Sequence, residues 1–170
     1  MNPESRAFIT RTAIFLPNAP VANDDIEAIL GCIGGKPSRA RRMVLRSNGI
    51  RQRHYAIDPE TGEPTHTNAQ LTAAAVRGLT GNGFDLSTID CLACGTARPD
   101  QLMPGHGVMV HGELGNPPCE VVTTSGICVS GIAALKYAWM AVRAGLAANA
   151  VATGSELPSL SLHARHFAAE

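Results

Sequence analysis

Cys128 has the position and the neighbours of a catalytic nucleophile. It follows a strand-like run at residues 120–124 and a turn of small residues, and it directly precedes the apolar stretch 129–144, for which we predict a helix. The N-terminus of a helix carries partial positive charge, which favours the thiolate form of cysteine and hence nucleophilic attack. Gly126, Ser130 and Gly131 leave room for a substrate to approach. Free cysteine is also a common core residue, so a structural role for Cys128 stays open at this point.

The other cysteines and the histidines do not form a recognisable metal site. Cys91 and Cys94 have the C-x-x-C spacing, but their apolar flanks predict a strand, on which residues three apart point to opposite faces. We therefore interpret them as core cysteines. No carboxylate or cysteine completes a metal-ligand spacing with the six histidines, which are His54, His66, His106, His111, His163 and His166. We predict neither a metal nor a cofactor, and surface or structural roles for the histidines.

A basic connector at residues 36–56 is the second candidate for function. It holds seven of the chain's 14 basic residues within 18 positions and no acid among them, namely Lys36, Arg39, Arg41, Arg42, Arg46, Arg51 and Arg53. Such a patch binds phosphates or an acidic protein, or it is a solvated loop. No aromatic side chains are interleaved to stack on bases, and the chain has no Walker A motif or dinucleotide glycine fingerprint.

The composition places these candidates in one globular α/β domain. The chain has 170 residues, of which 45% are hydrophobic and 16% charged, and its net charge is zero. These values exclude intrinsic disorder and argue against a nucleic-acid binder. No apolar run approaches the roughly 18 residues of a membrane span, and no signal peptide is visible. Five cysteines, an odd number, do not indicate a disulfide framework, so we expect a cytoplasmic protein with free thiols.

Strand-like and helix-like segments alternate along the chain. We predict strands at residues 7–16, 89–95, 120–124 and 149–153. We predict helices from Asp24 to about residue 33, with a capping box to Glu27, and at residues 68–79, 105–114 and 129–144. This alternation is typical of helices layered on a sheet. The last helix carries only Lys136 and Arg143 as charges, so we expect it to be buried on most sides, between layers or at a subunit interface.

The order and spacing of several motifs resemble the N-terminal half of the ketoacyl-acyl carrier protein synthase III enzymes, in the thiolase-like superfamily. Residues 9–17 with Asn23 to Asp25 are similar to the family's first strand and helix opening. Residues 49–54 resemble its G-I-R-x-R motif, and residues 89–100 its I-D-x-x-x-x-G-T-x-x-P-D segment. Cys128 occupies the position of the catalytic cysteine, and the spacing from Cys128 to Glu156 fits without gaps. The likeness covers essentially the whole chain.

The resemblance implies a fold and a reaction. The fold is one layered α/β half of the thiolase-like fold, spanning residues 1–170, with a mixed sheet, helices packed on it and a buried nucleophile helix. Cys128 would take an acyl group as a thioester, and carbon–carbon bond formation with a second thioester would release a β-keto product in fatty acid or polyketide-type metabolism. The family's catalytic His and Asn lie in a C-terminal half that this chain lacks, so that half is an expected partner, on a separate or cleaved chain.

Departures from the family refine the expected partners. The family's CoA-binding members carry a Trp just before the segment that resembles residues 46–51, and this chain has none there and one extra residue. That difference favours an acyl donor bound to acyl carrier protein over a CoA thioester, with Arg42 and Arg46 docking the carrier protein or its phosphopantetheine phosphate. The family forms homodimers, and Met103, just before Pro104, matches a residue that reaches into the neighbour's acyl pocket. A flexible Met there predicts medium or longer acyl chains.

Three other functions stay open from the sequence. The first is acyl transfer to oxygen or nitrogen without condensation. The second is a non-catalytic subunit that shapes the pocket of another chain, against which the intact Cys128 argues. The third is an α/β-type cysteine hydrolase, because residues 126–130 loosely resemble a nucleophile elbow, although no His–acid pair follows in the expected order.

Overall fold

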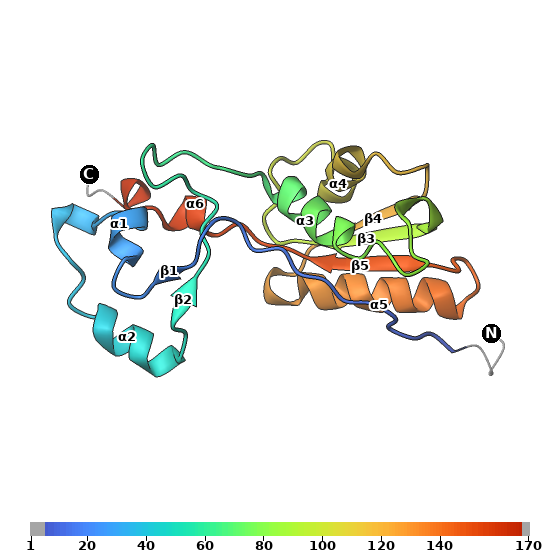
Figure 1. Cartoon of the computed structure of the whole chain (residues 1–170), viewed down its shortest axis with the longest axis horizontal. Helices are drawn as coiled ribbons and strands as arrows, with labels where there is room; N and C mark the ends of the chain where they lie inside the picture. Colours follow the sequence, from blue (N-terminus) through green and yellow to red (C-terminus); the bar gives the residue numbers. More distant parts are fainter. Residues whose placement is uncertain (1–5, 168–170) are drawn as a thin grey trace. The chain divides into compact units, whose positions relative to one another are not determined.

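The computed structural model describes residues 6–167, which form two compact units (Figure 1). The larger unit contains the N-terminal segment through Phe15 and the stretch Thr67–Glu156. The smaller unit contains Leu16–His66 and the chain from Leu157 onward. Each unit has its own secondary structure. None of the helices in the described residues has the length and apolar character that crossing a bilayer requires.

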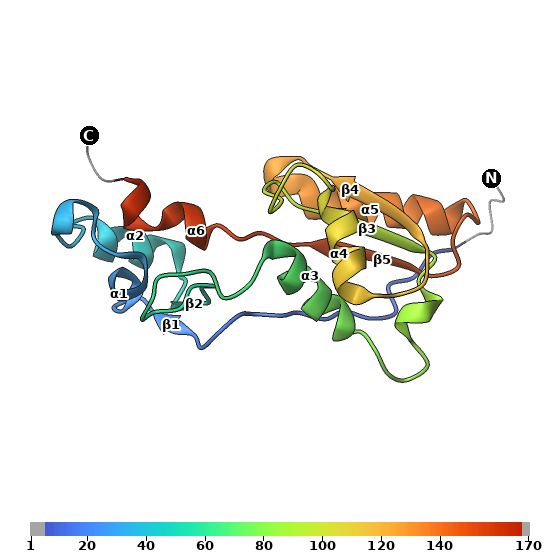
Figure 2. The ribbon, with the colours of Figure 1, turned by 90° about the horizontal axis from the view of Figure 1, so that it is seen from above.

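The larger unit is a three-layer α/β/α arrangement around a parallel sheet. Strand β3 (Cys91–Gly95) lies in the centre and pairs with β4 (Glu120–Thr124) on one side and β5 (Ala150–Gly154) on the other. Helix α5 (Ser130–Arg143) packs on one face of the sheet. Helices α3 (Asn68–Arg77) and α4 (His106–Leu114) cover the other face (Figure 1 and Figure 2). The predicted α/β layering is confirmed, and these elements lie within two residues of the predicted bounds.

The two faces of the sheet are packed differently. Larger aliphatic side chains fill the core under α3 and α4, with Leu92, Cys94 and Val110 among its buried members. Under α5 the core is mostly alanine, and Cys91 lies there against Ala141. Cys91 and Cys94 thus occupy opposite faces of β3, as the strand spacing predicts. The small side chains under α5 allow this helix to approach the sheet closely.

The residues of the 89–100 motif hold this unit together. The Asp90 carboxylate accepts hydrogen bonds from the amides of Ala148 and Asn149, at 2.9 and 3.0 Å, and so ties the start of β3 to the turn before β5. The Asp100 carboxylate accepts from the amides of Asn68 and Ala69, at 2.7 and 2.9 Å. These are unpaired donors of the first turn of α3, so Asp100 stabilises the start of that helix. The two carboxylates of the motif therefore fix the start of β3 against the turn before β5, and the start of α3 against the loop after β3.

The predicted strand at residues 7–16 is wrong. This segment is irregular backbone without strand pairing, and Phe8, Ile9 and Ile14 are exposed. Its β-branched and apolar residues favour a strand, but a strand needs a neighbour whose N–H and C=O groups complete the ladder. Among residues 6–167 no strand pairs with it.

The smaller unit is built from short elements. Strands β1 (Val21–Ala22) and β2 (Gln52–Arg53) pair antiparallel. Around them lie the helices α1 (Ile26–Leu30), α2 (Arg41–Asn48) and α6 (Ser159–Leu162). The predicted basic connector therefore contains α2 and β2.

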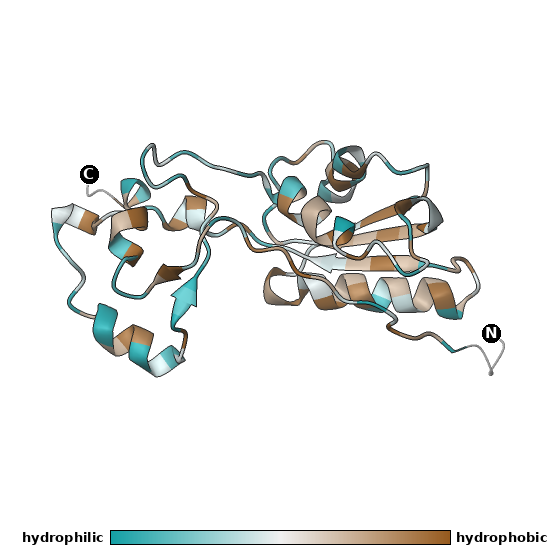
Figure 3. Ribbon diagram, in the orientation of Figure 1, coloured by the Kyte–Doolittle hydropathy of each residue, from teal (hydrophilic) through white to brown (hydrophobic). Residues whose placement is uncertain are grey.

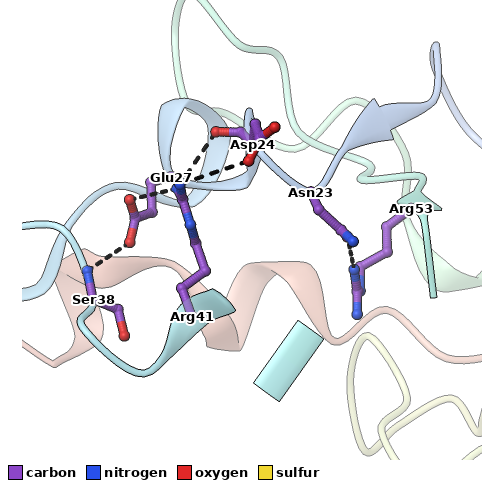
Figure 4. Close-up of polar contacts among 6 residues, drawn as sticks. All are labelled: Asn23, Asp24, Glu27, Ser38, Arg41 and Arg53. Atoms are coloured by element: carbon purple, nitrogen blue, oxygen red, sulfur yellow. Dashed lines mark hydrogen bonds and ion pairs between the residues drawn. The ribbon is translucent and has the colours of Figure 1, made fainter. Parts of the chain in front are cut away.

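The predicted capping box from Asp24 to Glu27 is wrong. Helix α1 is preceded by Asp25, whose side chain makes no capping hydrogen bond. Glu27 instead accepts hydrogen bonds from the Ser38 amide at 2.8 Å and from the Arg41 guanidinium at 2.7 Å (Figure 4). The Glu27 carboxylate therefore connects α1 to the start of α2, through a charge-assisted hydrogen bond to Arg41.

Helix α5 is buried along one stripe only, so the prediction of burial on most sides is wrong for the chain alone. Its buried residues are Ser130, Ala134, Ala138 and Ala141, which face the sheet. Apolar side chains outside this stripe are exposed, including Ile132, Leu135 and Trp139. Hydrophobic positions recur along the whole length of α5 (Figure 3). Exposed apolar patches of this kind mark surfaces that another protein segment covers.

Backbone-to-backbone contact joins α5 to the ends of the strands. A Cβ atom placed on Gly95, the last residue of β3, would lie 2.3 Å from the carbonyl oxygen of Ser130 and 2.7 Å from the amide nitrogen of Gly131. A Cβ on Gly131 would in turn lie 3.1 Å from the Cα of Gly154, the last residue of β5. Only glycines therefore allow the first turn of α5 to rest on the strand ends.

This contact predicts opposite effects of two glycine-to-alanine substitutions. Gly95→Ala should lower the free energy of unfolding by about 1–3 kcal/mol, because the new methyl group meets backbone that cannot rotate away. The matched control is Gly112→Ala in α4, where a Cβ meets no atom within 4 Å. The control should raise stability by about 0.5–1 kcal/mol, because it removes chain entropy from the unfolded state. Urea unfolding followed by circular dichroism measures both, and equal effects would contradict the contact.

Candidate functional site

Cys128 lies in the tight turn that connects β4 to α5. Residues Ile127–Val129 form one turn of 3-10 helix immediately before the first residue of α5. The Cys128 side chain is exposed, whereas Cys91 and Cys94 are buried and Cys32 and Cys119 are partly buried. The turn stands at the carboxyl ends of the parallel strands, which is where open α/β sheets place their ligand sites. The structure thus gives Cys128 the exposure that a nucleophile needs.

Ser130 holds the turn that carries Cys128. Its hydroxyl accepts a hydrogen bond from the Gly126 amide at 3.0 Å and donates one to the Ile127 carbonyl at 2.8 Å. The Ser130 carbonyl accepts from the Thr124 hydroxyl at 2.8 Å, which ties the end of β4 to the helix. Ser130 is 2% exposed, so these bonds are shielded from water. We predicted Ser130 only as a small residue beside the nucleophile. Its hydrogen bonds to the turn and to the end of β4 were not predicted.

Ile127, directly before Cys128, has a strained backbone. Its φ is +54°, in the left-handed region, which a β-branched residue rarely adopts. Strain of this kind costs about 1–3 kcal/mol and persists only where surrounding contacts hold it, often at functional sites. The hydrogen bond from Ser130 to the Ile127 carbonyl is such a contact. The turn therefore presents Cys128 in a fixed direction at the start of α5.

Gly131 has a packing role in this structure. Its Cα faces Gly154 across the contact between α5 and β5, so the space left by its missing side chain is filled by backbone. The substrate-binding role predicted for Gly131 stays a prediction. Met103 lies on an exposed loop before Pro104, with its side chain 86% accessible. Its predicted place in an acyl pocket likewise stays a prediction.

Helix α2 in the smaller unit presents the basic side chains predicted to bind a carrier. Arg42, Met43, Arg46 and Ser47 line a shallow, open hollow on its surface. Arg41 and Arg53 are not available in the same way, because Arg41 pairs with Glu27 and Arg53 donates to the Asn23 side chain at 2.8 Å (Figure 4). Within the described residues, the side chains of Arg42 and Arg46 form no ion pair or hydrogen bond. They therefore remain open to an outside partner.

A largely buried polar cluster lies at the carboxyl ends of β3 and β5. The Nε2 atom of His106 is 3.2 Å from the Ser155 hydroxyl and 3.3 Å from the Thr72 hydroxyl. Thr72 donates to Ser155 at 2.7 Å or to the Asn68 carbonyl at 2.8 Å. His106 is fully buried, and burial lowers the pKa of its imidazole, although the carboxylates of Asp100 and Glu156 act in the opposite direction.

We did not predict the burial of His106, although the spacing of the apolar residues around it in the sequence indicates that burial. His106, Val110 and Leu114 are spaced four residues apart along α4, and all three are buried. The helical period therefore places His106 on the apolar stripe of α4. Sequence reasoning grouped it with five other histidines and assigned no particular environment to any of them.

Burial also distinguishes the core cysteines chemically. It raises the pKa of Cys91 to about 12, with the Glu120 carboxylate adding to the effect, and it raises the pKa of Cys94 to about 11. Both therefore remain thiols near neutral pH, which suits core packing and opposes nucleophilic chemistry. Within residues 6–167, no group of three or more His, Cys, Asp or Glu side chains is arranged to hold a metal ion.

Curated proteins similar to this chain are named as one type of enzyme. No family model matches the chain. A protein of Bordetella petrii named beta-ketoacyl-[acyl-carrier-protein] synthase III is 32% identical over 151 residues, which are 89% of this chain and 44% of that protein. One of the same name from Xanthomonas oryzae pv. oryzae is 28% identical over 148 residues, 87% of this chain and 42% of that protein. The chain thus spans less than half the length of these relatives.

Solved structures agree with the sequence comparison. The beta-ketoacyl-[acyl-carrier-protein] synthase III of Thermus thermophilus superimposes with a TM-score of 0.69 at 25% identity, over 90% of this chain and 44% of that one. The tetronic acid condensing enzyme AbyA1 superimposes with a TM-score of 0.65 at 28% identity, over 87% of this chain and 44% of that one. The chain therefore has the thiolase-like fold, and in sequence and structure it resembles the N-terminal half of a beta-ketoacyl-acyl carrier protein synthase III.

Proposed function

We propose that this chain provides the nucleophile half of a condensing enzyme of the ketosynthase III type, with Cys128 as the acyl acceptor. The observation that carries the proposal is the exposed Cys128 at the start of α5, behind an isoleucine with a left-handed backbone. The similarity to synthase III proteins supports the same role for Cys128, because the resemblance implies that it would stand at the position of the family's catalytic cysteine. We expect a role in fatty acid or polyketide-type metabolism, and the likeness to AbyA1 supports the second.

The proposed reaction begins with thioester exchange. The Cys128 thiolate attacks the carbonyl carbon of an acyl thioester, a new carbon–sulfur bond forms, and the bond to the donor sulfur breaks. The donor leaves as a thiol after it takes up one proton. Backbone N–H groups at the start of α5, including that of Cys128, would stabilise the oxyanion of the intermediate. An enolate from a second thioester then attacks the acyl group, and Cys128 is released as thiolate while the β-keto product forms.

We propose that a second α/β half completes the enzyme. The relatives are more than twice as long as this chain, which covers 42–44% of them. By resemblance, the remaining half would supply the His and Asn that stabilise the enolate. The exposed apolar residues of α5, such as Ile132 and Trp139, are a surface that such a half would cover. Whether the second half lies on the same or a separate chain does not alter this role.

Two further parts of the proposal concern the acyl donor. Arg42 and Arg46 on α2 would dock an acidic acyl carrier protein, or the phosphate of its phosphopantetheine or of CoA, because their charges have no partner in the described chain. The exposed Met103 would reach the acyl pocket of a second copy in a homodimer and, being flexible, would accept medium or longer chains. Gly131 would contribute to the substrate path through its backbone.

The first prediction concerns acylation of Cys128. After incubation with a series of acyl thioesters, peptide mass spectrometry should find the acyl group on Cys128, and Cys128→Ala should abolish the adduct. The melting temperature should hardly change, because the side chain is exposed and little packing is lost. Cys119→Ala is the matched control and should retain acylation.

The outcomes of this experiment separate the alternatives. A stable adduct that is consumed by a second thioester, with a β-keto product, supports condensation. A stable adduct transferred only to an alcohol or amine indicates simple acyl transfer. Rapid release of free acid indicates a hydrolase, and no adduct in the presence of the completing half indicates a non-catalytic subunit.

The second prediction concerns alkylation of the native protein by iodoacetamide. Cys128 should react at pH 8, whereas Cys91 and Cys94 should remain unlabelled, because both are buried and their pKa values of about 12 and about 11 keep them as thiols. Raising the pH from 7 to 9 should leave this order unchanged, because 9 is still below both values. In urea all the cysteines should react. Labelling of Cys91 or Cys94 as fast as Cys128 in the native protein would contradict the assignment.

The third prediction concerns carrier docking. Arg42→Glu with Arg46→Glu should weaken binding of acyl carrier protein about tenfold and flatten its dependence on salt, because exposed pairs contribute about 0.5–1 kcal/mol each. Lys136→Glu, an exposed charge reversal in the other unit, is the control and should have little effect. Isothermal titration calorimetry at several salt concentrations measures both. If the double variant binds acyl carrier protein with unchanged affinity, Arg42 and Arg46 are only solvated surface residues and do not dock the carrier.

A further inference from the structure

A cluster of two buried side chains and one partly buried side chain lies next to the strand ends on which the nucleophile turn rests. We call His106, Thr72 and Ser155 the His106 cluster. The three groups come from different elements, namely α4, α3 and the residue after β5. The distances between their polar atoms are 2.7, 3.2 and 3.3 Å, so the three atoms form a closed triangle. The cluster thus ties both helices of one sheet face to the end of β5.

The cluster connects to the Cys128 turn through backbone alone. The Ser155 amide donates to the carbonyl of Gly95 at 3.1 Å. Gly95 in turn contacts Ser130 with no room for a Cβ atom, and Gly154 lies so close to Gly131 that a Cβ atom would be 3.1 Å from its Cα. No flexible side chain lies in these contacts to absorb a shift. A displacement of Ser155 must therefore move the strand ends and the first turn of α5 together.

We propose that His106 is a positioning residue for the nucleophile turn, acting through Ser155 and the glycine contacts between the strand ends and α5. The proposal rests on the proposed function for its catalytic consequence, because it is Cys128 that the turn presents. Among the described residues, the side chain of His106 has hydrogen-bond contacts with Thr72 and Ser155 and none with the Cys128 turn. Its effect is therefore to fix the position of Ser155. Neither the fold comparison nor the proposed reaction assigns it a role.

The chemistry of the cluster explains why a histidine is suited to this place. An imidazole offers one ring nitrogen to the two hydroxyls while the rest of the ring fills the core beside Val110. A neutral ring is required, because an imidazolium without a buried counter-charge would be costly there. The lowered pKa of His106 agrees with this state. His106 and Thr72 are buried and Ser155 is partly buried, and the contacts among their three polar atoms favour a single arrangement of the cluster.

Two substitutions of His106 separate positioning from mere packing. A glutamine amide reaches about as far as the Nε2 atom, so His106→Gln can keep the contacts to Ser155 and Thr72. An asparagine amide reaches only the Nδ1 position, so His106→Asn removes the contact of both hydroxyls with the ring nitrogen and leaves only their bond to each other. Ser155→Ala breaks the same link from the other side. The control is His111→Asn on the same helix, where the ring contacts the Pro117 carbonyl at 3.2 Å.

The test uses two readouts, measured on the whole chain together with its completing half. The first is hydrogen–deuterium exchange of the peptide that covers residues 125–133. His106→Asn and Ser155→Ala should speed exchange there by about tenfold relative to the rest of the larger unit, and His106→Gln should restore it to near the wild-type rate. The second is the rate of Cys128 acylation, which should fall about tenfold in the same two variants and recover with glutamine. His111→Asn should change neither.

The outcomes distinguish this inference from the proposed function. If the wild-type protein is not acylated but exchange at residues 125–133 rises selectively in His106→Asn, the proposed function fails and the positioning role stands. If the wild-type protein is acylated and His106→Asn changes neither the local exchange nor the acylation rate, the positioning role is overturned and the function stands. A uniform rise of exchange across the unit, without rescue by glutamine, also overturns it and leaves His106 a packing residue.

Discussion

The close contact between the strand ends and the first turn of α5 is the constraint on which the rest of this structure depends. Gly95 and Gly154 meet Ser130 and Gly131 through backbone atoms, and any side chain at these glycines would separate the layers. The alanine-lined core under α5 follows from the same close approach. Cys128 lies two residues before Ser130, the first residue of α5. The direction in which the turn presents the Cys128 side chain therefore depends on how α5 packs on the sheet.

The turn adds a local constraint to this contact. Ser130 bonds to both Gly126 and Ile127, and Ile127 is held with a left-handed backbone. A relaxed turn would give up this strain and change the direction of the following residue. A strained backbone beside an exposed cysteine is therefore better explained by a need to present that cysteine than by stability. The buried cysteines of β3, with raised pKa values, show the opposite environment.

Much of the larger unit could be predicted from the sequence, because its elements carry strong local signals. The apolar run after Cys128 and the alternation of short strands with helices predict α5, β4 and β5 closely. The segment at residues 7–16 could not be predicted in this way, because a strand depends on a neighbour that local sequence does not reveal. Ser130 and His106 were missed for a related reason. Their roles arise from hydrogen bonds to residues that reach them only through the fold, as with Ser155, which is 49 positions from His106.

The turn before α5 is proposed to present Cys128 as an acyl acceptor. A crystal structure of the protein after incubation with a medium-chain acyl thioester tests this most directly. We expect electron density continuous with the Sγ atom of Cys128, with the acyl carbonyl oxygen within hydrogen-bond distance of backbone N–H groups in this turn and at the start of α5. An unmodified Cys128 with the acyl group attached to another side chain would contradict it.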